Sequence, residues 1–222
     1  LDELKETSVG QAVRDEEHEA ENYRKDEEAR LAQLEKEREE IHQKNKTFFA
    51  QAVEAVKDAD AVIFVGGLNH NIDSEGFDRS DMKLPYEQDL LIEELLKVRK
   101  DIVLTFVGGS PVEMPWRNKA QAVLWSYYAG METGNALARI IFGEISPSGK
   151  LAETFPAKYE DCATAQNGQF GKWGEIRLDE GLYYGYRHHD KAGIKPAFCF
   201  GHGLSYTSFE YSGLKFQPEK DK

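Results

Sequence analysis

Charged side chains are concentrated in one short segment that directly follows an apolar run of the chain. Between positions 69 and 85, the sequence places Asp73, Glu75, Asp78 and Asp81 around Arg79. This arrangement has three interpretations. The side chains could form a network of ion pairs that pins a loop, they could include a catalytic carboxylate, or their oxygens could hold a metal ion.

Glu75 is the best candidate for chemistry in this segment. Its neighbours Ser74 and Gly76 are small and leave its carboxylate accessible, as a general acid must be to reach the leaving group of a substrate. The acidic spacing is not that of an EF-hand loop, and no nearby pair of histidines offers a transition-metal site, so a metal is the least favoured interpretation. Asp78 and Arg79 are adjacent, and we expect them to form an ion pair that holds the loop.

Glycine pairs follow two apolar runs of the sequence, as Gly66-Gly67 and Gly108-Gly109. In an open parallel sheet, ligands bind beyond the carboxyl ends of the strands, and glycine lets the backbone turn sharply there. Neither pair has the spacing of a dinucleotide fingerprint, and no phosphate-binding loop of the GxxxxGK[ST] type is present. A nucleotide-binding function is therefore disfavoured.

Apolar periodicity predicts alternating strands and helices from position 48 onward. Continuous apolar runs, typical of strands covered on both faces, occupy 61–65, 102–107 and 122–127. Helical spacing of apolar residues predicts helices at 48–56, 90–98 and 135–142. Strands that alternate with helices pair in parallel through right-handed crossovers, so we expect an α/β fold with a mainly parallel central sheet.

The C-terminal third has a different pattern. Gly, Gln, Asn and aromatic residues dominate positions 159–181, which predicts a long loop. Apolar and polar residues then alternate within 181–189 and 197–216, which predicts short antiparallel strands. Residues 216–222 are polar and are expected to be a linker.

Residues 1–47 form a separate charged segment. It contains fifteen Asp or Glu and nine Lys or Arg residues, a net charge of −6 and half of the chain's −12. No glycine or proline interrupts 11–46, so we expect one long helix. Its apolar stripe is too thin for a coiled coil, so we weigh a solvated charged arm against a partner-binding helix. In either case we expect packing to add little to its stability.

The composition bounds the class of protein. A chain of 222 residues that is 40% apolar can form one large domain or two small ones. The negative charge disfavours nucleic acid as a partner, and no apolar stretch is long enough to span a bilayer. Cys162 and Cys199 do not form a CxxC pair and are expected to be buried apolar residues. The sequence does not decide whether the protein is cytoplasmic, periplasmic or secreted.

Aromatic residues follow the second and third apolar runs. Trp116, Trp125, Tyr127 and Tyr128 could together offer a surface on which a sugar stacks. Core packing is expected for Trp125, which lies inside an apolar run. Trp116 follows Pro115 in a predicted loop and is the better candidate for stacking.

Several motifs, taken together and in order, resemble one known family. They are GLNHNIDSEGFDRSDMKLPYEQDLLIEELL, GGSPVEMPW, YYAGMETGNALARIIFGEISPSGKLAETFP, DEGLYYGYR and CFGHGLSYTSFEYSGL. Between Phe48 and Leu214 the chain is similar to the C-terminal α/β sandwich domain of family 3 glycoside hydrolases of the β-glucosidase type. The resemblance implies a three-layer sandwich, which the long N-terminal charged helix precedes.

The resemblance also implies a reaction and a role for named residues. Enzymes of this family are retaining hydrolases, with the nucleophilic aspartate on a barrel domain and the general acid/base on the sandwich domain. The glutamate before the glycine of the EGxDR pattern is Glu75 here, and Asp78 and Arg79 would hold its loop. Substrate contacts would come from Asn69, His70, Asp73 and Trp116. No cofactor or metal is implied.

The expected organisation follows from these motifs. Residues 1–47 would be a charged helical arm, 48–215 the sandwich domain and 216–222 a linker. The barrel motif is absent, so we expect this chain alone to lack activity on terminal β-linked sugars. Its expected partners are the barrel domain and a β-linked glucoside or oligosaccharide. We expect it to bind neither nucleic acid nor a membrane. The sequence leaves open whether the chain forms a homo-oligomer. The alternative is a non-catalytic carbohydrate-binding or scaffold module of the same fold.

Overall fold

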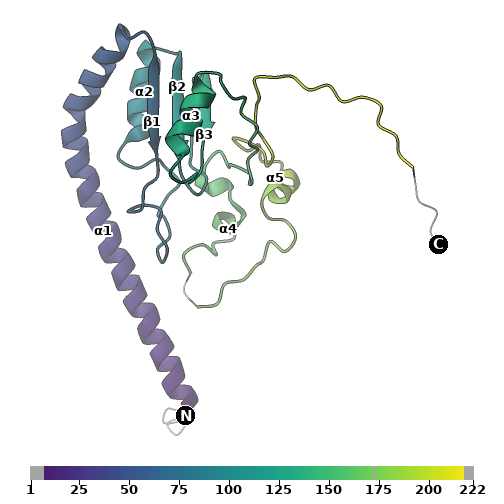
Figure 1. Cartoon of the computed structure of the whole chain (residues 1–222). Helices are drawn as coiled ribbons and strands as arrows, with labels where there is room; N and C mark the ends of the chain where they lie inside the picture. The colour runs from purple at the N-terminus through teal and green to yellow at the C-terminus, as the bar shows by residue number, and fades with distance from the viewer. Residues whose placement is uncertain (1–7, 173, 218–222) are drawn as a thin grey trace.

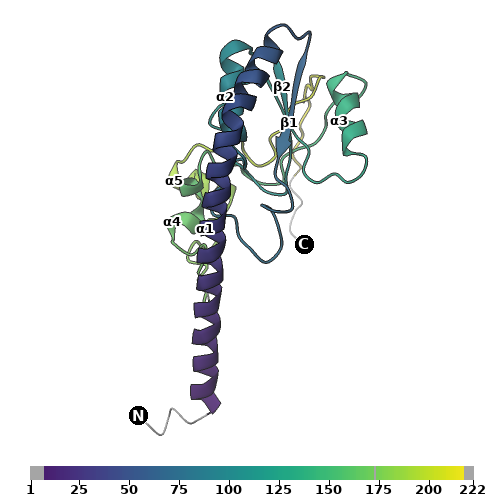
Figure 2. The same ribbon diagram turned by 90° about the vertical axis from the view of Figure 1, so that its left-hand side faces the viewer.

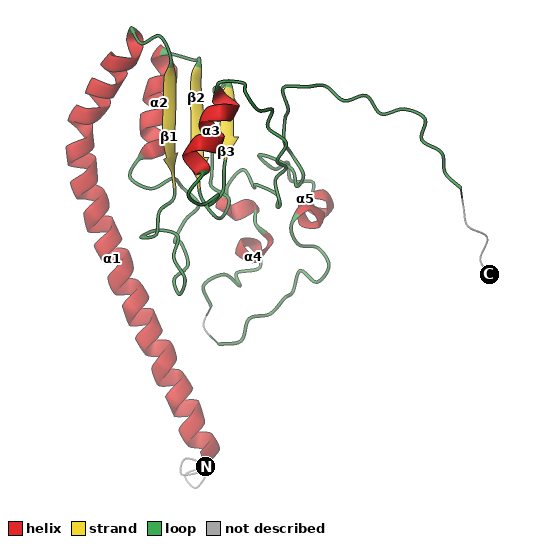
Figure 3. Ribbon diagram, viewed as in Figure 1, coloured by secondary structure: helices red, strands yellow, loops and turns green. Residues whose placement is uncertain are grey.

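A three-stranded parallel sheet forms the centre of the fold (Figure 1, Figure 3). The computed structural model describes residues 8–172 and 174–217. The strands are β1 (Val62–Gly67), β2 (Ile102–Val107) and β3 (Ala122–Trp125), and β2 lies in the middle. β1 pairs with β2 and β2 with β3, both in parallel. The predicted alternation of strands and helices and the predicted parallel pairing are confirmed.

Helices lie on both sides of this sheet, but they cover its two faces unequally (Figure 2). α1 (Ser8–Lys57) and α2 (Gln88–Val98) lie on one side, and α3 (Thr133–Ile141) lies on the other. α3 buries none of its own residues. On β1, Ile63 is 45% and Val65 is 70% exposed. The expectation that this strand is covered on both faces is therefore wrong, and the predicted three-layer packing is not confirmed.

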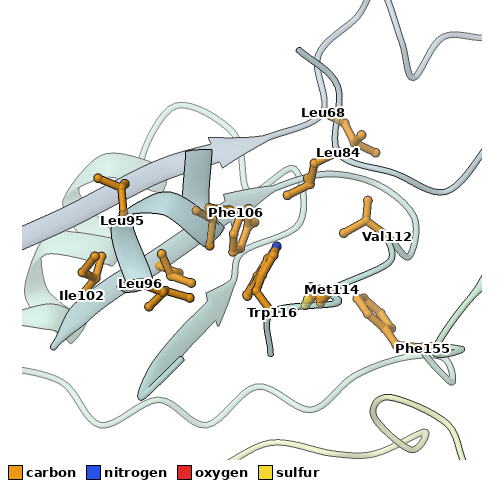
Figure 4. Packing of buried hydrophobic residues seen from close by; sticks show 12 residues of the cluster. Leu68, Leu84, Leu95, Leu96, Ile102, Phe106, Val112, Met114, Trp116 and Phe155 are labelled. Atoms are coloured by element: carbon orange, nitrogen blue, oxygen red, sulfur yellow. The ribbon is translucent and has the colours of Figure 1, made fainter. Parts of the chain in front are cut away.

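The core lies between the sheet and α2 (Figure 4). Alternate residues of each strand point to the same face, so Leu104 and Phe106 of β2 meet Ile92 and Leu96 of α2 there. Burying each such side chain contributes about 1.5–3 kcal/mol to folding. The ring of Trp116 is fully buried and stacks on Phe106 with 5.3 Å between ring centroids.

α1 is one unbroken helix of 50 residues. The two predicted helices at 11–46 and 48–56 join because no glycine or proline separates them. Its C-terminal part packs on the core through Ala52, Val53 and Val56, whereas its N-terminal part extends beyond the rest of the fold (Figures 1 and 2). No described helix, α1 included, is long and apolar enough to cross a membrane. The division of the chain at residue 47 stays a prediction.

The C-terminal third contains helical turns where strands were expected. α5 occupies Tyr186–Ala192, within the first predicted strand region. Among the described residues from position 155 onward, the only β-type pairing is an isolated antiparallel bridge between Phe155 and Phe198. The expected C-terminal antiparallel strands are therefore wrong. The predicted loop also holds η2 (Tyr159–Asp161) and α4 (Ala163–Gln166).

The two cysteines differ in exposure. Cys162 is half-buried, its Sγ lies 3.8 Å from Sδ of Met82, and burial raises the pKa of its thiol. Cys199 is exposed, so the expectation that both cysteines are buried is wrong for this residue.

Candidate active site

The segments that follow β1 and β2 start side by side at the carboxyl edge of the sheet. The amide of Leu68 donates to the carbonyl of Val107 at 2.8 Å. Gly67 has φ +126°, and a Cβ at that position would lie 1.9 Å from the same carbonyl oxygen. Only glycine fits such a close approach, which explains one of the two glycine pairs. We call residues 68–87, which leave this edge and lead to α2, the Glu75 loop.

Glu75 lies at the tip of a tight turn within this loop. Ser74 and Phe77 form an isolated antiparallel bridge, so Glu75 and Gly76 are the two central residues of the turn. Of these two, only Gly76 has a positive φ, at +92°, and a type II turn favours glycine at that position. Glu75 is exposed, and no hydrogen bond or ion pair joins its carboxylate to another residue in the described part of the chain. The turn thus presents a free carboxylate.

Asp73, two residues before Glu75, is held by the rest of the protein. Its Oδ2 accepts a hydrogen bond of 2.7 Å from the hydroxyl of Tyr128 and one of 3.2 Å from the amide of Gly109. Burial and the bond to Asp73 raise the pKa of Tyr128 to about 12. Tyr128 is therefore a protonated donor at neutral pH, and Asp73 is its acceptor.

Arg79 anchors the other side of the turn. Its Nη2 donates a hydrogen bond of 2.7 Å to the carbonyl oxygen of Pro111, in the segment that follows β2. Burial lowers the pKa of the guanidinium, although the nearby charges of Asp73 and Asp81 oppose this shift. The expected ion pair between Asp78 and Arg79 is wrong, because Arg79 points to the neighbouring segment and Asp78 is exposed.

The opposite side of the Glu75 loop lies against α1. Arg30 donates to the carbonyl of Asp78 at 2.8 Å, and Arg38 forms a salt bridge of 2.7 Å with Asp81. Nearer to α2, His42 contacts Glu87 at 2.5 Å. A hollow between helix and loop is lined by charged side chains and by apolar ones, the latter including Leu34, Ile41, Ile72 and Tyr86. Two apolar residues of α1, Leu34 and Ile41, therefore face this loop.

Asn69 and His70 stand at the start of the loop with different surroundings. Asn69 donates from Nδ2 to the hydroxyl of Tyr86 at 3.1 Å, and its Oδ1 accepts from the amide of Asn71 at 3.0 Å. These bonds occupy both ends of its amide and hold the chain locally. His70 is exposed. Substrate contacts by Asn69 and His70 stay predictions.

Trp116 belongs to the core and not to a surface. Its side chain is 0% exposed, and its Nε1 donates a hydrogen bond of 2.7 Å to Oδ1 of Asp89. The prediction that a sugar stacks on Trp116 is therefore wrong. Its position after Pro115 indicated a loop, but that loop folds back over the sheet and places the indole against Phe106.

Sequence reasoning missed the residues that hold the loop from a distance. Tyr128 attracted attention only as a possible stacking residue, and Gly109 only as half of a glycine pair. No pattern pointed to Arg30. Within the described ranges 8–172 and 174–217, no three His, Cys, Asp or Glu side chains come together so that they could hold a metal ion.

Comparison with known proteins places this fold and loop in a family. The profile described as "Glycosyl hydrolase family 3 C-terminal domain" matches residues 5–206. The chain belongs to glycoside hydrolase family 3. The match begins in the charged arm, so it extends further towards the N-terminus than the motifs from Phe48 onward.

The relatives of this family 3 domain are β-glucosidases. Thermostable beta-glucosidase B of Acetivibrio thermocellus is 46% identical over 164 residues, which are 74% of this chain and 22% of that protein. The crystal structure of a beta-glucosidase from Kluyveromyces marxianus in complex with glucose matches with a TM-score of 0.71 and 35% identity, over 75% of this chain and 20% of that one. A beta-glucosidase from Bifidobacterium adolescentis matches with a TM-score of 0.68 and 39% identity, over 73% and 24%. The family 3 domain therefore spans about a fifth of the length of these relatives.

Proposed function

We propose that this chain is the acid/base-bearing domain of a retaining β-glucosidase that removes terminal, non-reducing β-linked glucose. The observation that carries the proposal is the free carboxylate of Glu75 at the tip of a turn whose two sides are anchored. The β-glucosidases to which the chain is similar support the substrate class.

Glu75 would act in both steps of the reaction. As a carboxylic acid it would donate its proton to the glycosidic oxygen, and as a carboxylate it would then take a proton from the attacking water. Such an acid needs a pKa near the working pH, which burial of the carboxyl group provides. Glu75 is exposed here, so the substrate and a second domain would have to cover it during the reaction.

The nucleophile would come from that second domain. A retaining mechanism needs two carboxyl groups about 5–5.5 Å apart. Within the described residues, no contact places a second carboxylate against Glu75, and the carboxylates of Asp73 and Asp81 are held by Tyr128 and by Arg38 of α1. We therefore propose that the 222-residue chain alone does not hydrolyse β-glucosides. Turnover of an aryl β-glucoside by the purified chain, abolished by Glu75→Gln, would contradict this.

The surface of the chain supports a covering domain. The chain exposes 16251 Å², whereas a compact monomer of 25.2 kDa is expected to expose about 10,300 Å². Large apolar side chains account for part of this excess, and several lie in the C-terminal third, among them Leu178, Leu182, Leu204, Tyr211 and Leu214. Large apolar side chains exposed in this number favour packing of the C-terminal third against other protein.

The test uses the full-length protein that contains this domain. Glu75→Ala should leave the fold intact, because the side chain is exposed and makes no hydrogen bond or ion pair with the described residues. It should slow hydrolysis by about 100-fold or more for glucosides with poor leaving groups, which need protonation, and far less for nitrophenyl glucosides. Azide, a nucleophile that needs no general base, should partly restore turnover of nitrophenyl glucosides.

The matched control is Glu54→Ala. Glu54 is an exposed glutamate near the end of α1 that leads into β1, at the opposite edge of the sheet from the Glu75 loop. The Glu54→Ala variant should hydrolyse glucosides with poor leaving groups and nitrophenyl glucosides at the unchanged rate. Equal slowing of both substrates by Glu75→Ala, without rescue by azide, would remove Glu75 from the mechanism and leave Asp73 as the next carboxylate to test.

A further inference from the structure

Both sides of the Glu75 turn are fastened to the segment that follows β2. On one side, Asp73 accepts hydrogen bonds from Gly109 and Tyr128. On the other side, Arg79 donates to the carbonyl oxygen of Pro111. Between these two anchors, Glu75 has no partner in the described part of the chain. The position of the Glu75 carboxylate is therefore set by the two ends of the turn.

We propose that Asp73 and Tyr128 are positioning residues, which orient Glu75 towards the leaving group and do not bind the substrate. This inference rests on the proposed function of Glu75. It reassigns Asp73, which the motif alone had placed among the substrate-binding residues.

The geometry of the two bonds supports this role. Tyr128 and Gly109 both donate to the same oxygen, Oδ2 of Asp73, so that a single acceptor atom ties the turn to two segments, the one that follows β2 and the one that follows β3. A hydrogen bond to a charged acceptor is shorter and stronger than one between neutral groups, and the 2.7 Å bond from Tyr128 is short. The raised pKa of Tyr128 keeps the proton on its hydroxyl at neutral pH, so the hydroxyl is a donor to Asp73 there.

Gly109 makes this close approach possible. A Cβ at position 109 would lie 2.9 Å from Cε2 of Tyr128 and 3.0 Å from Oδ2 of Asp73, closer than such atoms pack. The φ of Gly109 is not in the left-handed region, so the need for glycine arises from space and not from backbone conformation. The second glycine pair of the sequence is thus explained by this contact.

The consequence for catalysis is a matter of distance. Misplacing a reacting group by about 1 Å can cost roughly 100-fold in rate, and Asp73 lies only two residues from Glu75. A turn released at Asp73 would place the general acid less often against the glycosidic oxygen. The loss of rate in such a variant would then be greater for leaving groups that need protonation, as it is for Glu75→Ala. It would be smaller than the loss caused by Glu75→Ala.

The experiment compares four variants of the full-length protein: Tyr128→Phe, Asp73→Ala, the double variant and Asp73→Asn. Tyr128→Phe and Asp73→Ala should each lower kcat for glucosides with poor leaving groups by about tenfold and leave nitrophenyl glucosides within about twofold, with KM unchanged. The double variant should lose no more than Asp73→Ala alone, because both remove the same contact. Asp73→Asn should retain most of the rate, because its amide oxygen can accept both bonds.

Two sets of controls make the outcome decisive. Tyr211→Phe removes a hydroxyl from a side chain that is 93% exposed and should change nothing. Thermal midpoints of all variants show whether the fold is kept, and Tyr128→Phe is the safest of them because Tyr128 is itself exposed.

Other results overturn the inference. If Asp73→Asn loses as much as Asp73→Ala and KM rises for both substrates, Asp73 binds the substrate through its charge. If Tyr128→Phe has no effect with poor leaving groups, the bond does not position Glu75. In both cases, a normal leaving-group dependence of Glu75→Ala keeps the proposed function intact. If Glu75→Ala itself lacks that dependence, the proposed function fails first.

Discussion

Arg30 of α1 donates a hydrogen bond of 2.8 Å to the carbonyl oxygen of Asp78, which lies 48 residues further along the chain. The same guanidinium lies over the ring of Phe77, 4.9 Å from its centroid. Both partners directly follow the turn that carries Glu75. The charged helix therefore braces the candidate catalytic loop from the side opposite to the β2 segment.

The stability of the chain should depend on the second half of the charged arm and not on the first. Removing residues 1–26 should shift the thermal midpoint by less than about 2 °C, because α1 extends beyond the fold there (Figure 2). Removing residues 1–45 also deletes Arg30, Arg38 and His42, and should lower the midpoint by about 5–10 °C. Circular dichroism melts of the two truncated chains measure this, and equal shifts would contradict the bracing role.

Gly109→Ala should reduce activity with only a small effect on stability. The new methyl group would push Asp73 and Tyr128 apart, so the full-length variant should lose about as much rate with poor leaving groups as Tyr128→Phe. Gly134→Ala is the matched control. Gly134 lies in α3, where an added Cβ would have no neighbour within 4 Å apart from the helix itself, so the substitution should be neutral or stabilise by up to about 1 kcal/mol. Unchanged activity in Gly109→Ala would show that the contact is not needed.

Trp116→Phe should destabilise the domain and leave substrate binding unchanged. The variant removes the donor to Asp89 and leaves a partly buried carboxylate oxygen unsatisfied, at a cost of about 1–3 kcal/mol. Trp125→Phe is the comparison, because its Nε1 has no hydrogen-bond partner among the described residues, and it should cost less. Urea unfolding of the chain and KM of the full-length protein are the measurements. A raised KM at unchanged stability would restore Trp116 as a sugar-stacking residue.

Asp89 should give the domain a stability that falls as pH rises through the acidic range. Burial raises the pKa of Asp89, although the bonds from Trp116 and from the amide of Leu84 oppose the shift. Between its ordinary value and the raised one, the folded state binds more protons than the unfolded state, so the free energy of unfolding decreases with rising pH.

Asp89→Asn removes this titration and tests the assignment. Urea unfolding at several acidic pH values should show the stability advantage of the native chain over the variant shrinking as pH rises, then levelling once Asp89 is ionised. The variant should be less stable at every pH, because both carboxylate oxygens accept bonds and an amide offers only one acceptor. A difference that stays constant across the acidic range would contradict the raised pKa.

The sequence by itself determined the alternation of strands and helices and the parallel sheet, and it singled out Glu75 as a candidate. Apolar runs at 102–107 and helical spacing at 90–98 are local patterns, and the elements they predict form where expected. The small neighbours of Glu75 are also local, and the turn they build leaves its carboxylate exposed. Such features are legible because the residues that cause them are adjacent in the chain.

Only the tertiary structure decided which side chains hold the loop and which are buried. Asp73 meets Tyr128 across 55 residues of sequence, and Arg30 meets Asp78 across 48. The burial of Trp116 and the exposure of Val65 depend on which elements cover each face of the sheet. Periodicity reports the polarity of a residue but not its partner. Contacts between distant segments arise when the crossovers close the fold, and a single sequence carries no local signal of them.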